Sequence, residues 1–392
     1  MDEPSLLLAK VDALREQVNC AQLSLKTAKV DSRLSKAASI GFATLFDRRL
    51  KELTKLRESI QKTGAGDGTW QQMHRSSASC KELFKECLEF LGGAMLRDTQ
   101  KGNDICDIAD VLLKQLSHKT VVEWGRVTLL AEAHFFTEIT GLIRLPFPDY
   151  GIWNLPIAVH ELGHFIGPRI PDGLGGFPFQ ARLDTIEKKY EGQPSEEQVA
   201  QIAQEQSQLR EIFSDLFATF SLGPAYACAC IVFLFDPQDA VACVDSATHP
   251  SHRKRVHLVL AALTQMSKTT AGNPYRKIVK NLRTLWQNNL RRADEQKCAN
   301  PEKVAALNYQ LLDLYPIMRD FIPKVQYSGW DRAVQLSKEF PLEGKVVNIL
   351  TENHTMADVL NAVWLWRLRQ VREPNLVHQV NLEAIALCRQ LM

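Results

Sequence analysis

The sequence has no marked excess of either charge. Lys and Arg number 47 against 45 Asp and Glu in 392 residues, a formal net charge of +2. This balance creates no long-range field that would attract nucleic acid or anionic lipid. We therefore expect no nucleic-acid partner, and any function has to arise from a local group of residues.

Paired cysteine motifs are missing as well. The nine cysteines are scattered, and none belongs to a CxxC pair. An odd number without framework spacing is typical of buried thiols in a reducing compartment. The first residues, MDEPSLLLAKVDALREQ, lack the basic start and the long apolar run of a signal peptide. These absences predict a cytoplasmic protein, and no membrane partner is expected.

Long hydrophobic runs are rare, and the one uncharged run is interrupted. Leu216–Phe235 carries no charge over 20 residues, which reaches the length of a membrane span. Gly223 and Pro224 divide it, and its Ala, Cys and Ser residues lower its hydrophobicity. We interpret it as a buried hairpin, in which Cys228 and Cys230 are small apolar residues.

Repeats and low-complexity tracts are absent, and helical periodicity dominates. Apolar residues recur at helical spacing over residues 5–62, which predicts a helical hairpin. The pattern returns after residue 275, where Thr355 and Asp358 form a capping-box sequence. Residues 63–69 (TGAGDGT) have the composition of a flexible linker and predict a boundary or a long loop.

β-Structure is expected to be scarce. Residues 121–148 mix β-branched and aromatic side chains, so periodicity does not separate helix from strand there. Leu142–Leu145 is the best strand candidate, because Pro146 and Pro148 end it. We expect this strand to be the place where a peptide substrate adds as a further strand.

The pentapeptide HELGH at residues 160–164 indicates a metal site. Asn154 can cap a helix there, and Pro156 suits its first turn. Residues four apart share one helix face, so the imidazoles of His160 and His164 can bind one metal ion. Glu161 lies beside the first ligand, where it can act as general base on a metal-activated water.

A third ligand is available on a later helix. Ser195 and Gln198 form a capping box, so this helix is expected to begin at Ser195. Glu211 is the candidate third ligand. Asp215 lies one turn later, where it can accept a hydrogen bond from the second nitrogen of a ligating histidine and fix its tautomer. Without HELGH upstream, the two carboxylates would be interpreted as ordinary solvated residues.

These residues resemble the gluzincin metallopeptidases, in which HExxH is followed by a helix with ExxxD and the Glu is the third zinc ligand. The segment HPSHRKR, from His249 to Arg255, contains HP-x4-R and is similar to the third signature of the CAAX-prenyl-protease and HtpX-type family. The resemblance covers about residues 142–260. It implies that His249 and Arg255 lie at the active site near the substrate or its oxyanion. Those relatives carry several membrane helices, so the chain resembles a soluble relative of them.

The motifs and the resemblance together predict a zinc-dependent endopeptidase that hydrolyses a peptide bond in a protein substrate, with one Zn²⁺ per chain. His249, Arg255 and Tyr226 are the candidates for stabilising the oxyanion. Arg253, Lys254 and Arg255 gather at a helix start, where the helix dipole disfavours cations. We therefore expect an anionic partner at that helix start.

The expected fold is mainly α, with a zincin-like metallopeptidase core, at most a small β-sheet, and helical flanks. The expected regions are 1–116 (helical N-terminal region), 117–270 (core) and 271–392 (helical C-terminal region). The charged insert 165–210 is a candidate cover for the cleft.

Two other functions stay open: a catalytically silent zincin-fold module for binding or sensing, and a metal-free helical interaction protein. Manganese or cobalt can also occupy a site of two histidines and a glutamate. His134, with Glu132 and Glu138 nearby, is interpreted as a packed histidine rather than a second metal site. Substrate identity and oligomeric state have no signal in the sequence.

Overall fold

The computed structural model describes most of the chain. The described residues are 2–28, 32–125, 127–131, 135–137, 142–147, 151–190, 192, 194–238, 245–268, 272–290, 301–342, 349–369 and 373–392. Over these residues the protein is mainly helical and contains one small sheet. The chain divides into two compact units, Met1–Cys106 with Arg126–Tyr150, and Asp107–Gly125 with Gly151–Met392.

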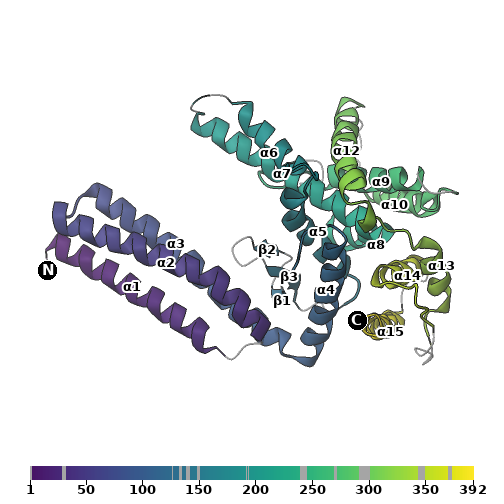
Figure 1. The fold of residues 1–392 in the computed structure, drawn as a ribbon, viewed down its shortest axis with the longest axis horizontal. Coiled ribbons are helices and arrows are strands. Elements are labelled where there is room, and N and C mark those ends of the chain that lie inside the picture. Colours follow the sequence, from purple (N-terminus) through teal and green to yellow (C-terminus); the bar gives the residue numbers. More distant parts are fainter. Residues whose placement is uncertain are drawn as a thin grey trace. The chain divides into compact units, whose positions relative to one another are not determined.

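Three long helices make up most of the first unit (Figure 1). They are α1 (Glu3–Thr27), α2 (Ser32–Thr63) and α3 (Asp67–Arg97), and each packs against the other two. Their apolar faces close one core that includes Leu7, Val11, Phe46 and Phe90. The predicted helical hairpin is therefore confirmed, and a third helix completes it.

The expected linker at 63–69 is wrong in its predicted role. Helix α2 continues to Thr63 and α3 begins at Asp67, so only three residues separate two helices of the same unit. Gly64 has φ +79, a backbone conformation that glycine adopts readily, and it turns the chain between the helices. The glycines of this segment thus make a tight connection rather than a boundary.

The small sheet also belongs to the first unit. Its strands β1 (Thr128–Ala131), β2 (Phe135–Thr137) and β3 (Leu142–Pro146) lie in the order β1-β3-β2. The predicted strand at 142–145 is confirmed as β3. However, β3 is parallel to β1 on one side and antiparallel to β2 on the other. The expectation that a peptide adds to this strand is wrong, because both of its edges already carry partners.

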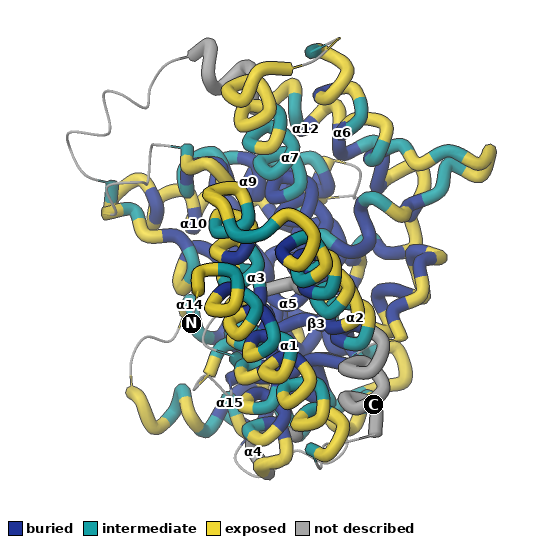
Figure 2. The backbone as a smooth tube through the Cα atoms, turned by 90° about the vertical axis from the view of Figure 1, so that its left-hand side faces the viewer, coloured by how far each residue is buried: buried dark blue, intermediate teal, exposed yellow. Residues whose placement is uncertain are grey.

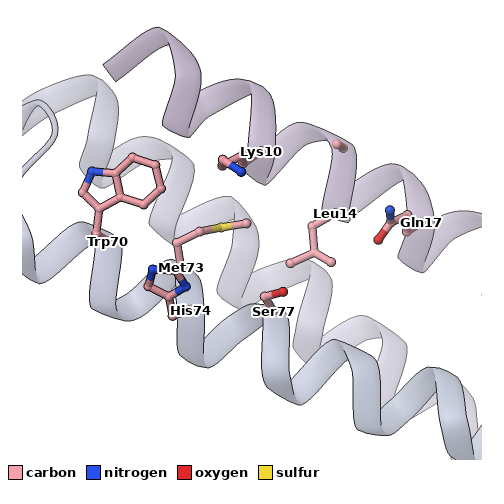
Figure 3. A pocket seen from close by; sticks show the side chains of 8 residues that line it. Lys10, Leu14, Gln17, Trp70, Met73, His74 and Ser77 are labelled. Carbon is pink, nitrogen blue, oxygen red and sulfur yellow. The ribbon is translucent and has the colours of Figure 1, made fainter. Parts of the chain in front are cut away.

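A groove of about 240 Å³ runs between α1 and α3. Leu14, Trp70 and Met73 are apolar residues of its lining, and Lys10 and His74 are polar ones (Figure 3). The indole N–H of Trp70 donates to Glu3 at 2.7 Å, which fixes one wall. No residue of the predicted metal site lines this groove.

The described residues of the second unit contain helices and no strand, and its centre is the pair α5 and α7, with α9 packed on α7. Figure 2 shows the buried backbone around α5 in dark blue. Helix α4 (Gln100–His118) begins before the division at residue 106 and continues into this unit. The other elements are α5 (Leu155–Ile166), η1 (Gly167–Arg169), α6 (Pro178–Lys188), α7 (Glu196–Leu222), α8 (Pro224–Ala229), η2 (Cys230–Leu234), α9 (His252–Lys268), α10 (Arg276–Asn289), α12 (Pro301–Phe321), η3 (Pro323–Val325), α13 (Trp330–Glu339), α14 (Met356–Arg369) and α15 (Pro374–Gln390).

The predicted regions differ from these units. Residues 126–150 belong to the first unit, and residues 271–392 share the second unit with the HELGH helix. The boundaries at 116 and 270 stay predictions. The insert 165–210 contains η1, α6 and the first half of α7, so much of it is helical.

The uncharged run 216–235 forms the end of α7, then α8 and η2. Gly223, with φ +61, breaks the helix where the sequence predicted an interruption. Cys228 and Cys230 are fully buried, as predicted. Among the described helices, none combines the length and the apolar character that a membrane span requires.

Candidate metal centre

Helix α5 carries the HELGH motif through the interior of the second unit. It begins at Leu155, after Asn154 and with Pro156 in its first turn, as predicted. The side chain of Asn154 makes no capping hydrogen bond, so the expected cap is wrong in that detail. Eleven of the 12 residues of α5 are buried. The motif therefore lies in the core and is not part of a solvated helix face.

Helix α7 brings two carboxylates into the same interior. Its start is the predicted capping box: the amide of Gln198 donates to the Ser195 hydroxyl at 3.3 Å, and the Gln198 side chain accepts from the Ser195 amide at 2.8 Å. From residue 211 to its end at Leu222, every residue of α7 is buried. Glu211 and Asp215 open this buried half.

Gly163 allows α5 and α7 to approach closely. A Cβ atom at this position would lie 2.8 Å from the Cα atom of Ser214, closer than real Cβ atoms come to other atoms. Only glycine permits this contact without a backbone shift. Gly163 was assigned no role in the sequence, although a residue without a side chain inside the motif is a signal for helix contact.

The contact places three ligand groups around one point. The Nε2 atoms of His160 and His164 are 3.1 Å apart. Glu211 lies with Oε2 at 3.3 Å from His160 Nε2 and Oε1 at 3.2 Å from His164 Nε2. Ligands about 2.0–2.1 Å from a tetrahedral zinc ion are separated by about 3.3 Å, so these distances fit a single ion. The three residues are the one such group of His, Cys, Asp or Glu found among the described residues.

The burial and the ionisation of the Glu211 carboxylate suit it to bind a cation. Its Oε2 atom is buried and accepts no hydrogen bond from the described residues. Burial by itself raises the pKa of Glu211, but the interactions with the imidazoles of His160 and His164 outweigh burial and hold this pKa far below its usual range. His160 Nε2 and Arg255 Nη2 each lie 3.3 Å from Oε2 without forming a hydrogen bond to it. A buried charged group without a hydrogen bond is costly, and a bound cation would offset that cost. Two imidazoles and one carboxylate are a donor set that zinc accepts.

Asp215 orients the first histidine as predicted. Its Oδ1 atom lies 3.0 Å from His160 Nδ1, so that the Nδ1–H group can donate to it. Nε2 then faces the other two ligand groups. Burial by itself lowers the pKa of His160, but the carboxylates of Asp215 and Glu211 outweigh it and raise this pKa to about 10. A metal ion has to displace the proton that this shift retains on the imidazole.

Arg255 supports the ligands from inside the protein. Its Nε and Nη2 groups donate to Asp215 at 2.7 and 2.8 Å, and Nη2 lies 3.3 Å from Glu211 Oε2. The expected anionic partner of the α9 start is thus an internal carboxylate, Asp215, and the neighbouring Lys254 bonds to Asp245. Because Arg255 is buried and bound to Asp215, this geometry does not favour the expected contact with an oxyanion.

Tyr226 also binds Asp215. Its hydroxyl donates to Asp215 Oδ1 at 2.5 Å and lies 3.1 Å from His160 Nδ1. Its ring is parallel to the imidazole of His160, with centroids 6.2 Å apart. Burial raises the pKa of Tyr226 well above its usual value, so the hydroxyl keeps its proton. The expected oxyanion role has no support in this geometry, because the hydroxyl is fully buried behind His160.

His249 is the oxyanion candidate with an accessible side chain, which is 54% exposed. Its Nε2 atom lies 3.5 Å from Glu211 Oε1, and its Nδ1 atom is 2.7 Å from the hydroxyl of Thr248. The exposed half of α7 holds this loop, since Gln208 donates to the Ser246 carbonyl at 3.0 Å and Ser207 to the Thr248 carbonyl at 3.0 Å. His249 therefore approaches the ligand residue Glu211 from the side that is open to solvent.

Glu161 differs from the other acidic residues of the centre. It follows His160 on α5 and is buried, yet within the described part of the chain its carboxylate forms neither an ion pair nor a hydrogen bond. The role of general base stays a prediction. The predicted packing of His134, with Glu132 and Glu138 nearby, lies outside the described residues.

No family model, no curated protein and no solved structure matches this chain.

Proposed function

We propose that this chain is a zinc-dependent endopeptidase with a zincin-like core, acting on protein or peptide substrates. One observation carries the proposal: the ligand atoms of His160, His164 and Glu211 all lie within 4.8 Å of one another. Asp215 stands behind His160 at hydrogen-bond distance, as a supporting carboxylate does in histidine metal sites.

His160, His164 and Glu211 would hold the metal ion. When bound, zinc supplies a Lewis acid that lowers the pKa of a water molecule and polarises a carbonyl group. Asp215 keeps the ring of His160 in one orientation, while Arg255 keeps Asp215 ionised and, together with Tyr226, holds it in place.

The remaining residues divide the proton transfers and the charge stabilisation. Glu161 takes a proton from the attacking water and passes it to the leaving amine, a role that contributes about 10²–10⁴-fold in rate. His249 donates a hydrogen bond from Nε2 to the oxygen on which negative charge develops. Thr248 holds the imidazole of His249 through its Nδ1 atom, 2.7 Å from the hydroxyl.

Metal content tests the site first. We expect elemental analysis of the purified wild-type protein to find about one zinc per chain, the stoichiometry of a single three-residue ligand group. Glu211→Ala should lose it, because a ligand is removed. Glu205→Ala is the matched control: the same substitution on the same helix, at a residue that pairs with exposed Lys189. Wild-type protein that takes up no zinc would contradict the proposal and favour a metal-free helical interaction protein.

Cleavage of an unfolded protein such as casein tests the reaction. We expect wild-type protein to cleave it and Glu161→Gln to retain zinc while losing about 10²–10⁴-fold in rate. Zinc binding with no cleavage by the wild-type protein across a set of unfolded proteins would instead favour a zincin-fold module for binding or sensing.

A further inference from the structure

The break between α7 and α8 is what brings Tyr226 to the metal centre. Asp215 and Tyr226 are 11 residues apart, yet the tyrosine hydroxyl touches the aspartate at 2.5 Å. In an unbroken α-helix, two residues at this separation lie about 16 Å apart along the axis. Gly223, with φ +61 and ψ −140, ends α7 and lets α8 turn back toward Asp215.

Such a break leaves helix-end backbone groups without partners from the helices themselves. One buried side chain, Asn361 of α14, satisfies two of them. Its Nδ2 group donates to the Leu222 carbonyl at 2.7 Å, and its Oδ1 atom accepts from the Ala225 amide at 2.9 Å. Nδ2 also donates to the carbonyl of Ala357 in its own helix at 2.8 Å, which fixes the orientation of the amide.

Tyr327 also packs against the break between α7 and α8. The backbone amide of Tyr327 donates to the Phe220 carbonyl at 2.9 Å. A Cβ atom at Gly223 would lie only 2.5 Å from Cδ1 of the Tyr327 ring, so the ring packs directly against this glycine. The Tyr327 hydroxyl donates to Asp358 at 3.0 Å, and Asp358 lies one turn before Asn361 on α14. The geometry of the break therefore depends on α14, more than 130 residues later in the sequence.

We propose that Asn361 is a positioning residue of the metal centre. It holds the α7–α8 break, the break places Tyr226, and Tyr226 holds Asp215 against Nδ1 of His160. An amide suits this position because it offers a donor to Leu222 and an acceptor to Ala225 at the same time. The inference rests on the proposed metal site but not on peptide hydrolysis, so its test measures metal affinity and not activity.

The test is a double-mutant cycle read out as zinc affinity, measured by competition with a chelator. Asn361→Leu keeps a similar volume and removes both hydrogen bonds to the break. Tyr226→Phe removes the hydroxyl that contacts Asp215, at the other end of this series of contacts. Loss of a supporting hydrogen bond typically weakens metal binding about 10–100-fold. We expect each single variant to lose about 10-fold and the double variant to lose little more, because both act through the same path.

Ser117→Ala is the matched control. Ser117 is also fully buried and bridges one backbone carbonyl, Val122, and one backbone amide, Trp124, at 2.5 and 2.6 Å. It lies outside the hydrogen-bond chain that leads to His160. We expect this variant to be less stable to urea and to keep the zinc affinity of the wild-type protein.

Several results would overturn the inference. Unchanged zinc affinity in Asn361→Leu, multiplicative losses in the double variant, or an equal loss in Ser117→Ala would each do so. If Asn361→Leu does not fold, Asn361→Asp gives the same reading: it keeps the acceptor for Ala225, loses the donor for Leu222, and is expected to lose zinc affinity as well. Wild-type protein without zinc would contradict the proposed function and this inference together, whereas zinc binding without the predicted coupling contradicts the inference alone.

Discussion

The two halves of α7 place the same kind of side chain in opposite environments. In the first half, Glu205 pairs with Lys189 at 2.8 Å while both side chains stay partly exposed, at 32% and 55%. In the second half, Glu211 and Asp215 are buried and face histidine and arginine side chains. Exposed pairs contribute about 0–1 kcal/mol, whereas breaking a buried pair costs about 3–5 kcal/mol. Helix α7 thus has a partly exposed first half and a second half whose charged residues are buried.

The two buried carboxylates also differ from each other. Asp215 accepts hydrogen bonds from Arg255 and Tyr226 and lies 3.0 Å from His160 Nδ1, so both of its oxygens are satisfied. Glu211 keeps one oxygen without a hydrogen bond to any described residue. Hydrogen bonds within the protein satisfy both oxygens of Asp215, whereas Glu211 Oε2 lies 3.3 Å from His160 Nε2 and from Arg255 Nη2 without a hydrogen bond to either, as suits a ligand of a cation.

The largest effect on stability is expected for Arg255→Met. It leaves Asp215 buried without its cation, so we expect the free energy of unfolding of the zinc-free protein to fall by about 3–5 kcal/mol. Urea unfolding measures the loss. Adding Asp215→Asn to this variant should restore part of the stability, because the unpaired charge is then removed. A loss of under about 1 kcal/mol would mean that the pair behaves as a surface pair.

The next largest effect is expected for Asp215→Asn, measured as zinc affinity. Without the negative charge, Nδ1 of His160 loses its charged hydrogen-bond acceptor and Nε2 becomes a weaker ligand, so we expect affinity to fall about 10–100-fold. Chelator competition gives the value. Unchanged affinity would show that Asp215 stabilises the fold through Arg255 and not the metal site.

Gly163→Ala tests the close contact of the two helices. The new methyl group would meet Ser214 at 2.8 Å, so we expect a loss of about 1–3 kcal/mol in the free energy of unfolding, with weaker zinc binding as Glu211 is pushed away. Gly92→Ala is the matched control, since nothing lies within 4 Å of a methyl group there. In α3 that change should be neutral or stabilise by up to about 1 kcal/mol. Similar losses in both variants would contradict the packing argument.

The smallest effect is expected in the exposed half of α7. Glu205→Ala should change the free energy of unfolding by less than about 1 kcal/mol, because water already solvates both partners of the pair with Lys189. Zinc affinity should stay unchanged. A change as large as that of Arg255→Met would show that the two halves of α7 are not energetically distinct.

Much of the local structure could be predicted from short-range patterns. The start of α7 at the Ser195 capping box, the start of α5 around Pro156 and the break at Gly223 each depend on a few adjacent residues. The capping box of Thr355 and Asp358 is present as well. Two predictions made from equally short patterns were wrong: the segment 63–69 is no boundary or long loop but holds a three-residue turn between α2 and α3, and β3 cannot receive a peptide because it is the central strand. Their outcome depended on what packs against them, which no local pattern contains.

The sequence by itself determined which residues could bind a metal, since HELGH and the spacing of Glu211 and Asp215 are properties of the chain and of helix geometry. Only the tertiary structure decided which partners the other polar side chains near the site contact. Arg255 and Tyr226 face Asp215 and leave His249 on the open side, while Asn361 holds the turn that makes this possible. The physical reason is burial, because a charged or polar group in the core must find its partner wherever the fold supplies one.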